Sequence, residues 1–301
     1  MRQSNFSARA AVLLAAMLSL GGCGGSGGAT GGAHAWRSGE VAAAWAEGYE
    51  GQGATITVVD EFSGDRFAGN LEGSRAVKTH GGWTALQAQL IAPKADLRTR
   101  DYYTNAGSAV PLASGLNVIN GSYGIIASRQ LALDEFDRIE QSVIGHAQNG
   151  TAVVTKAAGN YAIAVDGTDN AGKLDALNGA LIGTQSNLFV GALNRNGSPD
   201  AKANLASYSN YAGSNAQVQQ QFLVVGVDSG ETGLAGTSFA APIVAGYAAI
   251  LGSKFTSATP TQITNQLLDT ARTDTINGYN VAIHGQGEAS ITRALAPSSL
   301  R

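Results

Sequence analysis

Apolar residues occur in short continuous runs that alternate with longer segments of helical spacing. The runs predict buried strands at residues 54–60, 95–98, 118–122, 152–157, 188–192 and 222–225. Apolar positions three and four residues apart predict helices at residues 80–91, 131–147, 238–254 and 261–271. This alternation indicates an α/β fold, in which helices cover both faces of a doubly wound, mainly parallel sheet.

The segment Gly-Thr-Ser-Phe-Ala-Ala-Pro, from Gly236 to Pro242, follows the last of these strands. Gly236 allows a tight turn of the backbone, and Pro242 is tolerated in the first turns of a helix. We expect Ser238 in the first turn of that helix, where free N–H groups and the helix dipole favour negative charge. The segment is typical of a serine nucleophile. The alternative interpretation is a Thr or Ser N-cap on a buried, alanine-rich helix.

Three further polar residues lie where predicted strands end or helices begin. Asp60 closes the strand at 54–60, His80 opens the helix at 80–91, and Asn160 follows the strand at 152–157. Catalytic groups of an open parallel sheet gather at the carboxyl ends of its strands, so we expect these residues near Ser238. A serine nucleophile needs a base and a group that orients the base, and a side-chain amide can stabilise an oxyanion.

Together these motifs resemble the subtilisin-like serine proteases, the subtilase family. The matching segments occur in the order Asp, His, Ser and lie at residues 59–60, 80–81, 118–124, 157–160 and 236–242. The resemblance implies that Asp60 orients His80, that His80 is general base and then acid, and that Ser238 is the nucleophile. It implies that Asn160 and the backbone N–H of Ser238 form the oxyanion hole. Within the family, the chain resembles most the protease domains of bacterial autotransporter subtilases, and its closing segment, residues 285–295, is similar to their last segment.

The resemblance also implies two walls of a substrate cleft. One is an edge segment that pairs with an extended substrate, and it comprises Ser122, Tyr123 and Gly124. The other borders the primary specificity pocket, and it comprises Ala157, Ala158 and Gly159. Main-chain pairing gives affinity with little sequence preference, and small apolar walls admit apolar side chains. We therefore expect an endopeptidase with a broad, mainly apolar preference.

The chain departs from the family pattern beside two of these residues. Glu61 and Phe62 follow Asp60 where relatives have a small hydroxyl or glycine pattern, and Gly82 and Trp83 replace the family's Thr-His. Neither change removes a catalytic atom. Glu61 brings a second negative charge near the site, and this charge raises the pKa of a nearby imidazole.

Composition limits the classes of function. The 301 residues, of which 44% are hydrophobic and 14% charged, are enough to bury one large core. A net charge of −3 gives no basic face, so nucleic acid is not an expected partner. A single cysteine excludes an intrachain disulfide. We expect a monomer that acts on peptide or protein substrates.

No cofactor and no metal site are expected. Residues 166–170, Asp-Gly-Thr-Asp-Asn, gather oxygen ligands that suit calcium, but a solvated loop is the favoured interpretation. No pair of histidines has the spacing of a zinc site.

The N-terminal residues predict a targeting segment. Arg2 and Arg9 precede an apolar stretch at residues 10–20 that is too short for a permanent transmembrane helix. The following Leu-Gly-Gly-Cys, which ends at Cys23, resembles the bacterial lipoprotein cleavage box. We expect a signal peptide at 1–22, a lipidated Cys23 with a Gly-rich tether at 23–35, and a peptidase domain at 36–301. Gly24 after the cysteine favours the outer membrane. The alternative is an ordinary cleaved signal peptide with an incidental cysteine.

The function that these features favour is a lipid-anchored serine endopeptidase of the bacterial envelope. The alternative is a catalytically silent subtilase fold that binds peptides or an envelope partner. Another serine hydrolase, such as an esterase, is disfavoured because the chain lacks the Gly-x-Ser-x-Gly elbow. A related acid-active family uses a carboxylate as base, and His80 at the helix start argues against it.

Overall fold

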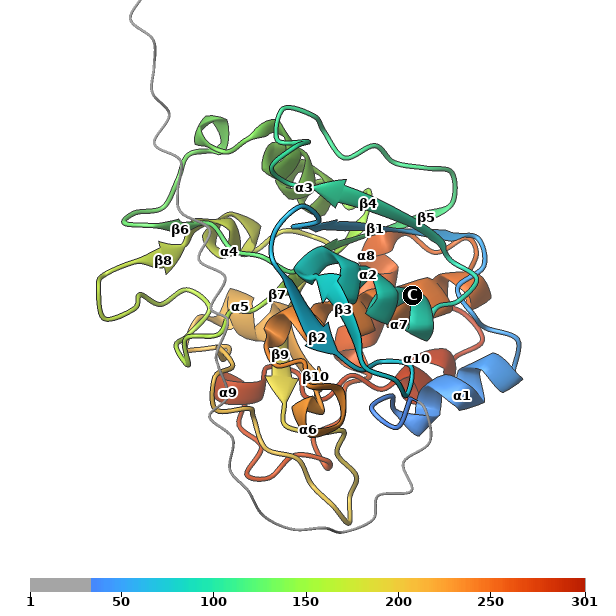
Figure 1. The fold of residues 1–301 in the computed structure, drawn as a ribbon. Helices are drawn as coiled ribbons and strands as arrows, with labels where there is room; N and C mark the ends of the chain where they lie inside the picture. Colours follow the sequence, from blue (N-terminus) through green and yellow to red (C-terminus); the bar gives the residue numbers. More distant parts are fainter. Residues whose placement is uncertain (1–33, 301) are drawn as a thin grey trace, which may run out of the picture.

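A six-stranded parallel sheet forms the centre of the protein (Figure 1). The structure is a computed structural model that describes residues 34–300. In the order β10-β9-β7-β5-β1-β4, neighbouring strands are hydrogen-bonded and parallel. Their bounds are β1 (Ala54–Asp60), β4 (Asp96–Asp101), β5 (Leu116–Gly121), β7 (Val153–Ala157), β9 (Asn187–Leu193) and β10 (Phe222–Gly226). The predicted parallel sheet is confirmed.

Helices cover both faces of this sheet, as the pattern predicted. One hydrophobic core joins the sheet to α1 (Gly39–Ala46), α2 (His80–Ile91), α7 (Ala241–Lys254), α8 (Pro260–Asp269) and α10 (Ile291–Leu295). A second core on the other face joins it to α3 (Arg138–Gln148), α4 (Ala176–Leu181) and α5 (Ala216–Gln221). Among residues 34–300, no helix is long and apolar enough to cross a bilayer.

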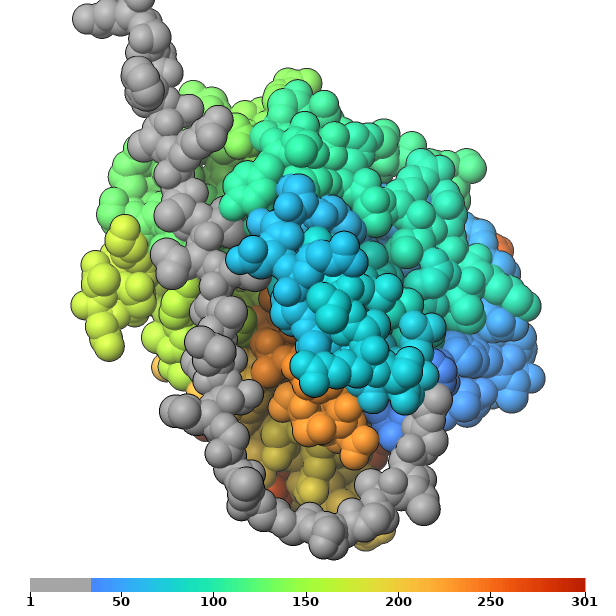
Figure 2. All heavy atoms as spheres, in the orientation of Figure 1, coloured from blue at the N-terminus to red at the C-terminus, as the bar shows by residue number. Residues whose placement is uncertain are grey.

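Several short elements lie outside the sheet. They are the antiparallel pairs β2 (Arg66–Gly69) with β3 (Ala76–Thr79) and β6 (Ile126–Ala127) with β8 (Leu174–Asp175), the helices α6 (Ser229–Thr232) and α9 (Val281–His284), and the 3₁₀ turns η1 (Leu133–Glu135) and η2 (Thr237–Phe239). The end of β2 is hydrogen-bonded to α6, from Asn70 N to Thr232 O at 2.8 Å. In Figure 2 the orange segment before α7 lies against the cyan segment of β2 and β3.

Two predicted helices begin later in the structure than the pattern indicated. The helix expected from residue 131 begins at Arg138, because η1 ends in an extended, buried Phe136 that the core holds. The helix expected from Ser238 begins at Ala241, because Gly236 has a φ of 129° and η2 follows it. Ser238 therefore lies in a 3₁₀ turn before the α-helix and not in the helix's first turn, which corrects the expectation.

Helix α7 is buried from Ala241 to Gly252 and packs against the sheet and against α2. Gly246 lies at the contact with α2, where an added Cβ would come within 2.3 Å of Ile91 Cγ2. Ile91 is fully buried and β-branched, so it has little freedom to move aside. The close approach of the two helices therefore depends on a residue without a side chain at position 246.

We expect Gly246→Ala to lower the free energy of unfolding by about 1–3 kcal/mol, the usual cost of overpacking a core. Gly145→Ala is the matched control, because Gly145 lies in α3 and an added Cβ would meet nothing within 4 Å. The control should raise stability by about 0.4–1 kcal/mol through a more restricted unfolded chain. Urea unfolding of both variants measures the difference, and equal stabilities would contradict the packing argument.

Candidate active site

Asp60 and His80 form a buried hydrogen-bonded pair at the carboxyl edge of the sheet. Asp60 ends β1 and has no exposed surface, and His80 is the first residue of α2. His80 Nδ1 lies 2.6 Å from Asp60 Oδ1. Thr84, one turn further along α2, donates to Asp60 Oδ2 at 2.8 Å, and Glu61 N donates to Oδ1 at 2.7 Å. Both oxygens of the carboxylate thus have donors, and the imidazole is held in one orientation.

The surroundings of His80 raise the pKa of its imidazole. Burial alone lowers this pKa, but the Asp60 charge, the hydrogen bond to Asp60 and the Glu61 charge together outweigh it. Two hydrogen bonds hold the backbone of Glu61 at the site: Glu61 N donates to Asp60 Oδ1, and Glu61 O accepts from Gly81 N at 2.8 Å. A raised pKa keeps the imidazole protonated up to a higher pH, and a protonated imidazole cannot accept a proton.

Ser238 lies in η2, next to the histidine. The ring of Phe239, the following residue, lies 5.5 Å from the His80 ring between centroids. Ser238 Oγ donates to Ser122 O at 3.1 Å, and Ser122 Oγ donates to Ser238 O at 2.9 Å. Within residues 34–300 no hydrogen bond joins Ser238 to His80. The hydroxyl therefore lies at the site but points to the edge segment.

Asn160 is held with its amide nitrogen available for a ligand. Its Oδ1 accepts from Thr237 N at 2.8 Å and from Thr237 Oγ1 at 3.0 Å. Thr237 Oγ1 in turn accepts from Gly159 N at 3.0 Å. Because the carbonyl oxygen is engaged, the orientation of the amide is fixed. Asn160 Nδ2 makes no hydrogen bond within the described part of the chain.

The two predicted cleft walls flank these residues. Ser122 and Tyr123 are buried, and the Tyr123 hydroxyl donates to Glu140 Oε1 at 3.0 Å, so this ring packs inward. Burial raises the pKa of Glu140 to about 7. Gly124 approaches Asp175, whose Oδ2 would lie 2.6 Å from an added Cβ. The edge segment can therefore offer a substrate mainly its backbone.

The second wall continues directly from β7. Ala157 ends the strand and Ala158 is buried, with its carbonyl accepting from Asn178 and Asn210 at 3.0 Å each. Gly159 has a φ of 115°, and an added Cβ there would lie 2.4 Å from Asn210 Nδ2. Only glycine fits both this backbone angle and this space.

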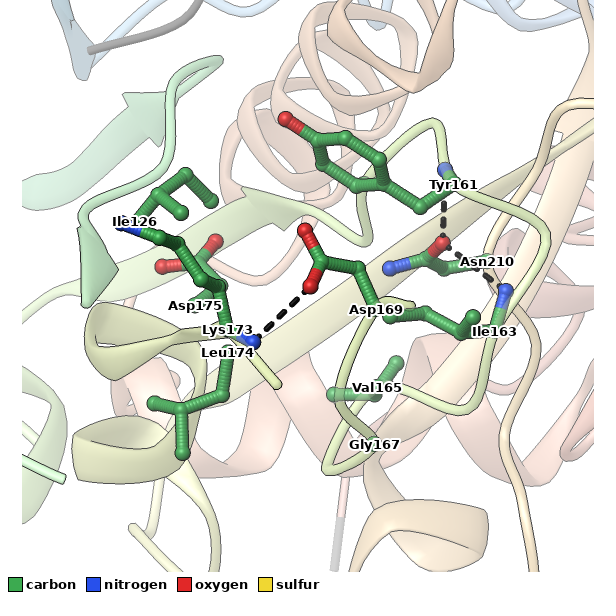
Figure 3. Close-up of a pocket in the computed structure, with 11 residues that line it drawn as sticks. Ile126, Tyr161, Ile163, Val165, Gly167, Asp169, Lys173, Leu174, Asp175 and Asn210 are labelled. Atoms are coloured by element: carbon green, nitrogen blue, oxygen red, sulfur yellow. Dashed lines mark hydrogen bonds between the residues drawn. The ribbon is translucent and has the colours of Figure 1, made fainter. Parts of the chain in front are cut away.

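A narrow pocket opens beside Gly159 (Figure 3). Its apolar lining comes from Ile126, Ile163, Val165 and Leu174. Figure 3 shows the Asp169 carboxylate among these side chains, with one oxygen accepting from Lys173 N at 2.8 Å. The lining of this pocket is thus mixed.

Asp101, which belongs to none of the sequence motifs, organises the loop after Asp60. Its Oδ2 accepts from Phe62 N and Ser63 Oγ, and its Oδ1 accepts from Tyr103 N and Thr104 N, at 2.8–3.0 Å. Burial raises the pKa of Asp101, but these four hydrogen bonds lower it further, with a net decrease. Asp101 ends β4 as Asp60 ends β1, and this shared position is the sequence feature that could have identified it.

The remaining candidates do not form a metal centre in the described residues. Within residues 34–300 no group of three or more His, Cys, Asp or Glu side chains is placed to hold a metal ion. Asp169 Oδ1 accepts from Ala171 N and Lys173 N at 2.8 Å, which stabilises its own loop. Cys23 and the predicted signal peptide lie outside the described residues.

The sequence matches the profile of peptidase S8, the subtilase family, over residues 64–288. This segment is about three quarters of the chain. The chain belongs to the subtilase family. It is accordingly a serine-type endopeptidase by class. His80, Asn160 and Ser238 lie inside the matched segment, whereas Asp60 precedes it, so the placement of Asp60 rests on its contact with His80.

Solved structures of other subtilases share the fold. The prenylagaramide maturation protease PagA is 20% identical with a TM-score of 0.55, and the match covers 86% of this chain and 98% of that one. A protease from Pseudoalteromonas arctica is 19% identical with a TM-score of 0.53, covering 86% and 94%. The MycP3 protease of the type VII (ESX-3) secretion system is 19% identical with a TM-score of 0.52, covering 85% and 86%. No curated protein sequence matches the chain.

In this subtilase, Glu61→Gln should lower the pKa of His80 by removing one of the charges that raise it. The acidic limb of the pH profile of kcat/KM, which reports the free enzyme's base, should then move to lower pH. Glu47→Gln removes an exposed carboxylate that does not act on His80, and it should leave the limb in place. A limb unmoved by Glu61→Gln would show that the Glu61 charge does not reach the imidazole.

Proposed function

We propose that the protein hydrolyses peptide bonds through an acyl-enzyme, with Ser238 as nucleophile, His80 as general base and Asp60 as the group that orients His80. The observation that carries this proposal is the buried contact of 2.6 Å between His80 Nδ1 and Asp60 Oδ1, beside the turn that holds Ser238. A donor–acceptor arrangement of this kind fixes the imidazole with its other nitrogen free to take a proton.

The proposed reaction begins when Ser238 Oγ attacks the substrate carbonyl and its proton passes to His80 Nε2. Asn160 Nδ2 and the Ser238 backbone N–H donate to the oxygen that becomes negative. His80 then gives the proton to the leaving amine, and water cleaves the acyl-enzyme by the same route in reverse. In the free enzyme the Ser238 hydroxyl is bonded to Ser122 O. A substrate N–H that pairs with Ser122 O would release the hydroxyl to His80.

The substrate class that we propose is an extended segment of a peptide or protein. The edge segment of Ser122, Tyr123 and Gly124 offers backbone groups for β-strand pairing. The small apolar wall of Ala157, Ala158 and Gly159 favours an apolar side chain beside it. The preference for individual side chains stays a prediction.

The second candidate function is a catalytically silent subtilase fold that binds peptides. One observation favours it, because the Ser238 hydroxyl donates to Ser122 O and not to His80. Catalytic hydrogen bonds are often long or misaligned in free enzymes and tighten when substrate binds, and the buried Asp60–His80 pair has no role in a binding module. We therefore favour the enzyme.

Ser238→Ala should abolish both proteolysis and labelling by a fluorophosphonate probe, while the protein stays folded. In subtilisin the loss of the nucleophile costs about a millionfold in kcat, and we expect a loss of that order. Ser229→Ala replaces an exposed serine in α6 and should retain full activity and labelling. Substantial turnover by pure Ser238→Ala protein would refute the nucleophile, and a folded wild type without labelling would favour the silent alternative.

We also propose that the chain is a lipoprotein of the bacterial envelope, anchored through Cys23 in the outer membrane. The support is the Leu-Gly-Gly-Cys box after an apolar stretch, followed by Gly24. Each buried CH₂ contributes about 0.8 kcal/mol, so one acyl chain binds marginally and two or more anchor stably.

Cys23→Ser should leave an active enzyme that is no longer recovered with membranes, because the acyl chains cannot be attached. The wild type should sediment with membranes and incorporate labelled fatty acid. Fractionation of cells that express each form, with immunoblotting, measures this. Recovery of both forms in the soluble fraction would show that the segment is an ordinary signal peptide.

A further inference from the structure

Lys156 is a fully buried lysine in the strand that leads to Asn160. It lies in β7, only 1% of its surface is exposed, and its Nζ donates to Asp175 Oδ2 at 3.1 Å. Its Nζ also donates to Ala157 O at 2.8 Å. A lysine is almost never fully buried without a partner, because removing an ammonium from water is costly. A buried ion pair seldom adds net stability over an apolar pair of similar volume, so stability alone does not explain this one.

Asp175 connects the same ammonium to the opposite wall of the cleft. Its Oδ1 accepts from Ile125 N at 2.9 Å, directly after the edge segment. The same oxygen accepts from Leu177 N and Asn178 N and so caps helix α4. Gly124 lies so close to Asp175 Oδ2 that a Cβ would come within 2.6 Å of it. In Figure 3 Asp175 lies at the wall of the pocket, near Ile126.

We propose that Lys156 and Asp175 are positioning residues that set the separation of the two cleft walls. One ammonium contacts the Ala157 carbonyl on the pocket wall and the carboxylate that holds Ile125 beside the edge segment. The pair touches no reacting atom and acts through the backbone of both walls. This inference rests on the proposed function, because the walls matter only if an extended peptide binds between them.

Lys156→Met tests the pair by keeping the length of the side chain and removing its charge. We expect kcat/KM for fluorescein-labelled casein to fall at least about tenfold, mainly through KM, since a hydrogen bond to a charged group is lost. The hydrolysis of p-nitrophenyl acetate, which is too small to span the walls, should change less than twofold. Lys94→Met is the matched control, because Lys94 pairs with Glu50 at 2.7 Å on the exposed surface. The control should alter neither reaction.

Asp175→Asn provides a second variant in case Lys156→Met does not fold. Asparagine keeps an oxygen for Ile125 N and remains a good N-cap for α4, but it removes the charge that Lys156 needs. It should likewise weaken casein turnover and spare the small ester. Equal losses of both substrates, or no loss of casein turnover in either variant, would overturn the positioning role.

A binding measurement separates this inference from the proposed reaction. In the inactive Ser238→Ala background, casein binds without being cleaved. There, Lys156→Met should weaken the binding of labelled casein at least about tenfold, as measured by fluorescence anisotropy. Failure of the wild type to label with fluorophosphonate would reject the proposed reaction and leave this result standing. Casein binding that is unchanged by Lys156→Met would reject the positioning role and leave the reaction standing.

Discussion

The buried carboxylate of Asp60 is the constraint on which the site depends. It has no exposed surface, and an ionised group without partners is very unfavourable in such a place. Three donors satisfy it: His80 Nδ1, Thr84 Oγ1 and Glu61 N. Two of these come from one face of α2, so the requirement of Asp60 fixes the rotation of that helix against β1. The orientation of the imidazole is therefore fixed by the same hydrogen bonds that the buried Asp60 carboxylate requires.

The other half of the site is held by backbone and hydroxyl groups without charge. Ser122 and Ser238 exchange two hydrogen bonds, each between a hydroxyl and the other residue's carbonyl, and Asn120 Nδ2 donates to Ser122 Oγ at 2.9 Å. Thr237 binds the oxygen of Asn160. The turn that carries Ser238 is thereby attached to the ends of β5 and β7. The buried Asp60–His80 pair on one side thus faces a turn whose hydroxyl can exchange partners on the other.

The sequence predicted the sheet and the neighbourhood of the site, but not the contacts that hold the site. Continuous apolar runs mark parallel strands, and the carboxyl ends of such strands meet, so Asp60 and Asn160 could be placed at one edge. The start of α7 was predicted too early, because the residues of a 3₁₀ turn and those of the first turn of an α-helix show the same pattern in the sequence. Thr84 lies four residues after His80, on the same helix face, and that spacing was a usable signal. The partner of Lys156 could not be found, since a loop without periodicity brings Asp175 to it.

Three aspartates satisfy the backbone N–H groups of the loops at this edge, as regular pairing does for the strands. Asp60 accepts Glu61 N, Asp101 accepts three backbone N–H groups, and Asp175 accepts three more. A carboxylate only accepts, and its two oxygens offer about four sites, so one side chain can satisfy several loop N–H groups that no strand can reach. The side-chain partners of the three differ. His80 Nδ1 is hydrogen-bonded to Asp60 and Lys156 Nζ pairs with Asp175, whereas Asp101 relies on backbone N–H groups and the Ser63 hydroxyl. The cleft therefore combines a hydrogen-bonded Asp–His pair, a Lys–Asp ion pair and a carboxylate held by neutral donors, and its geometry depends on all three aspartates keeping these donors.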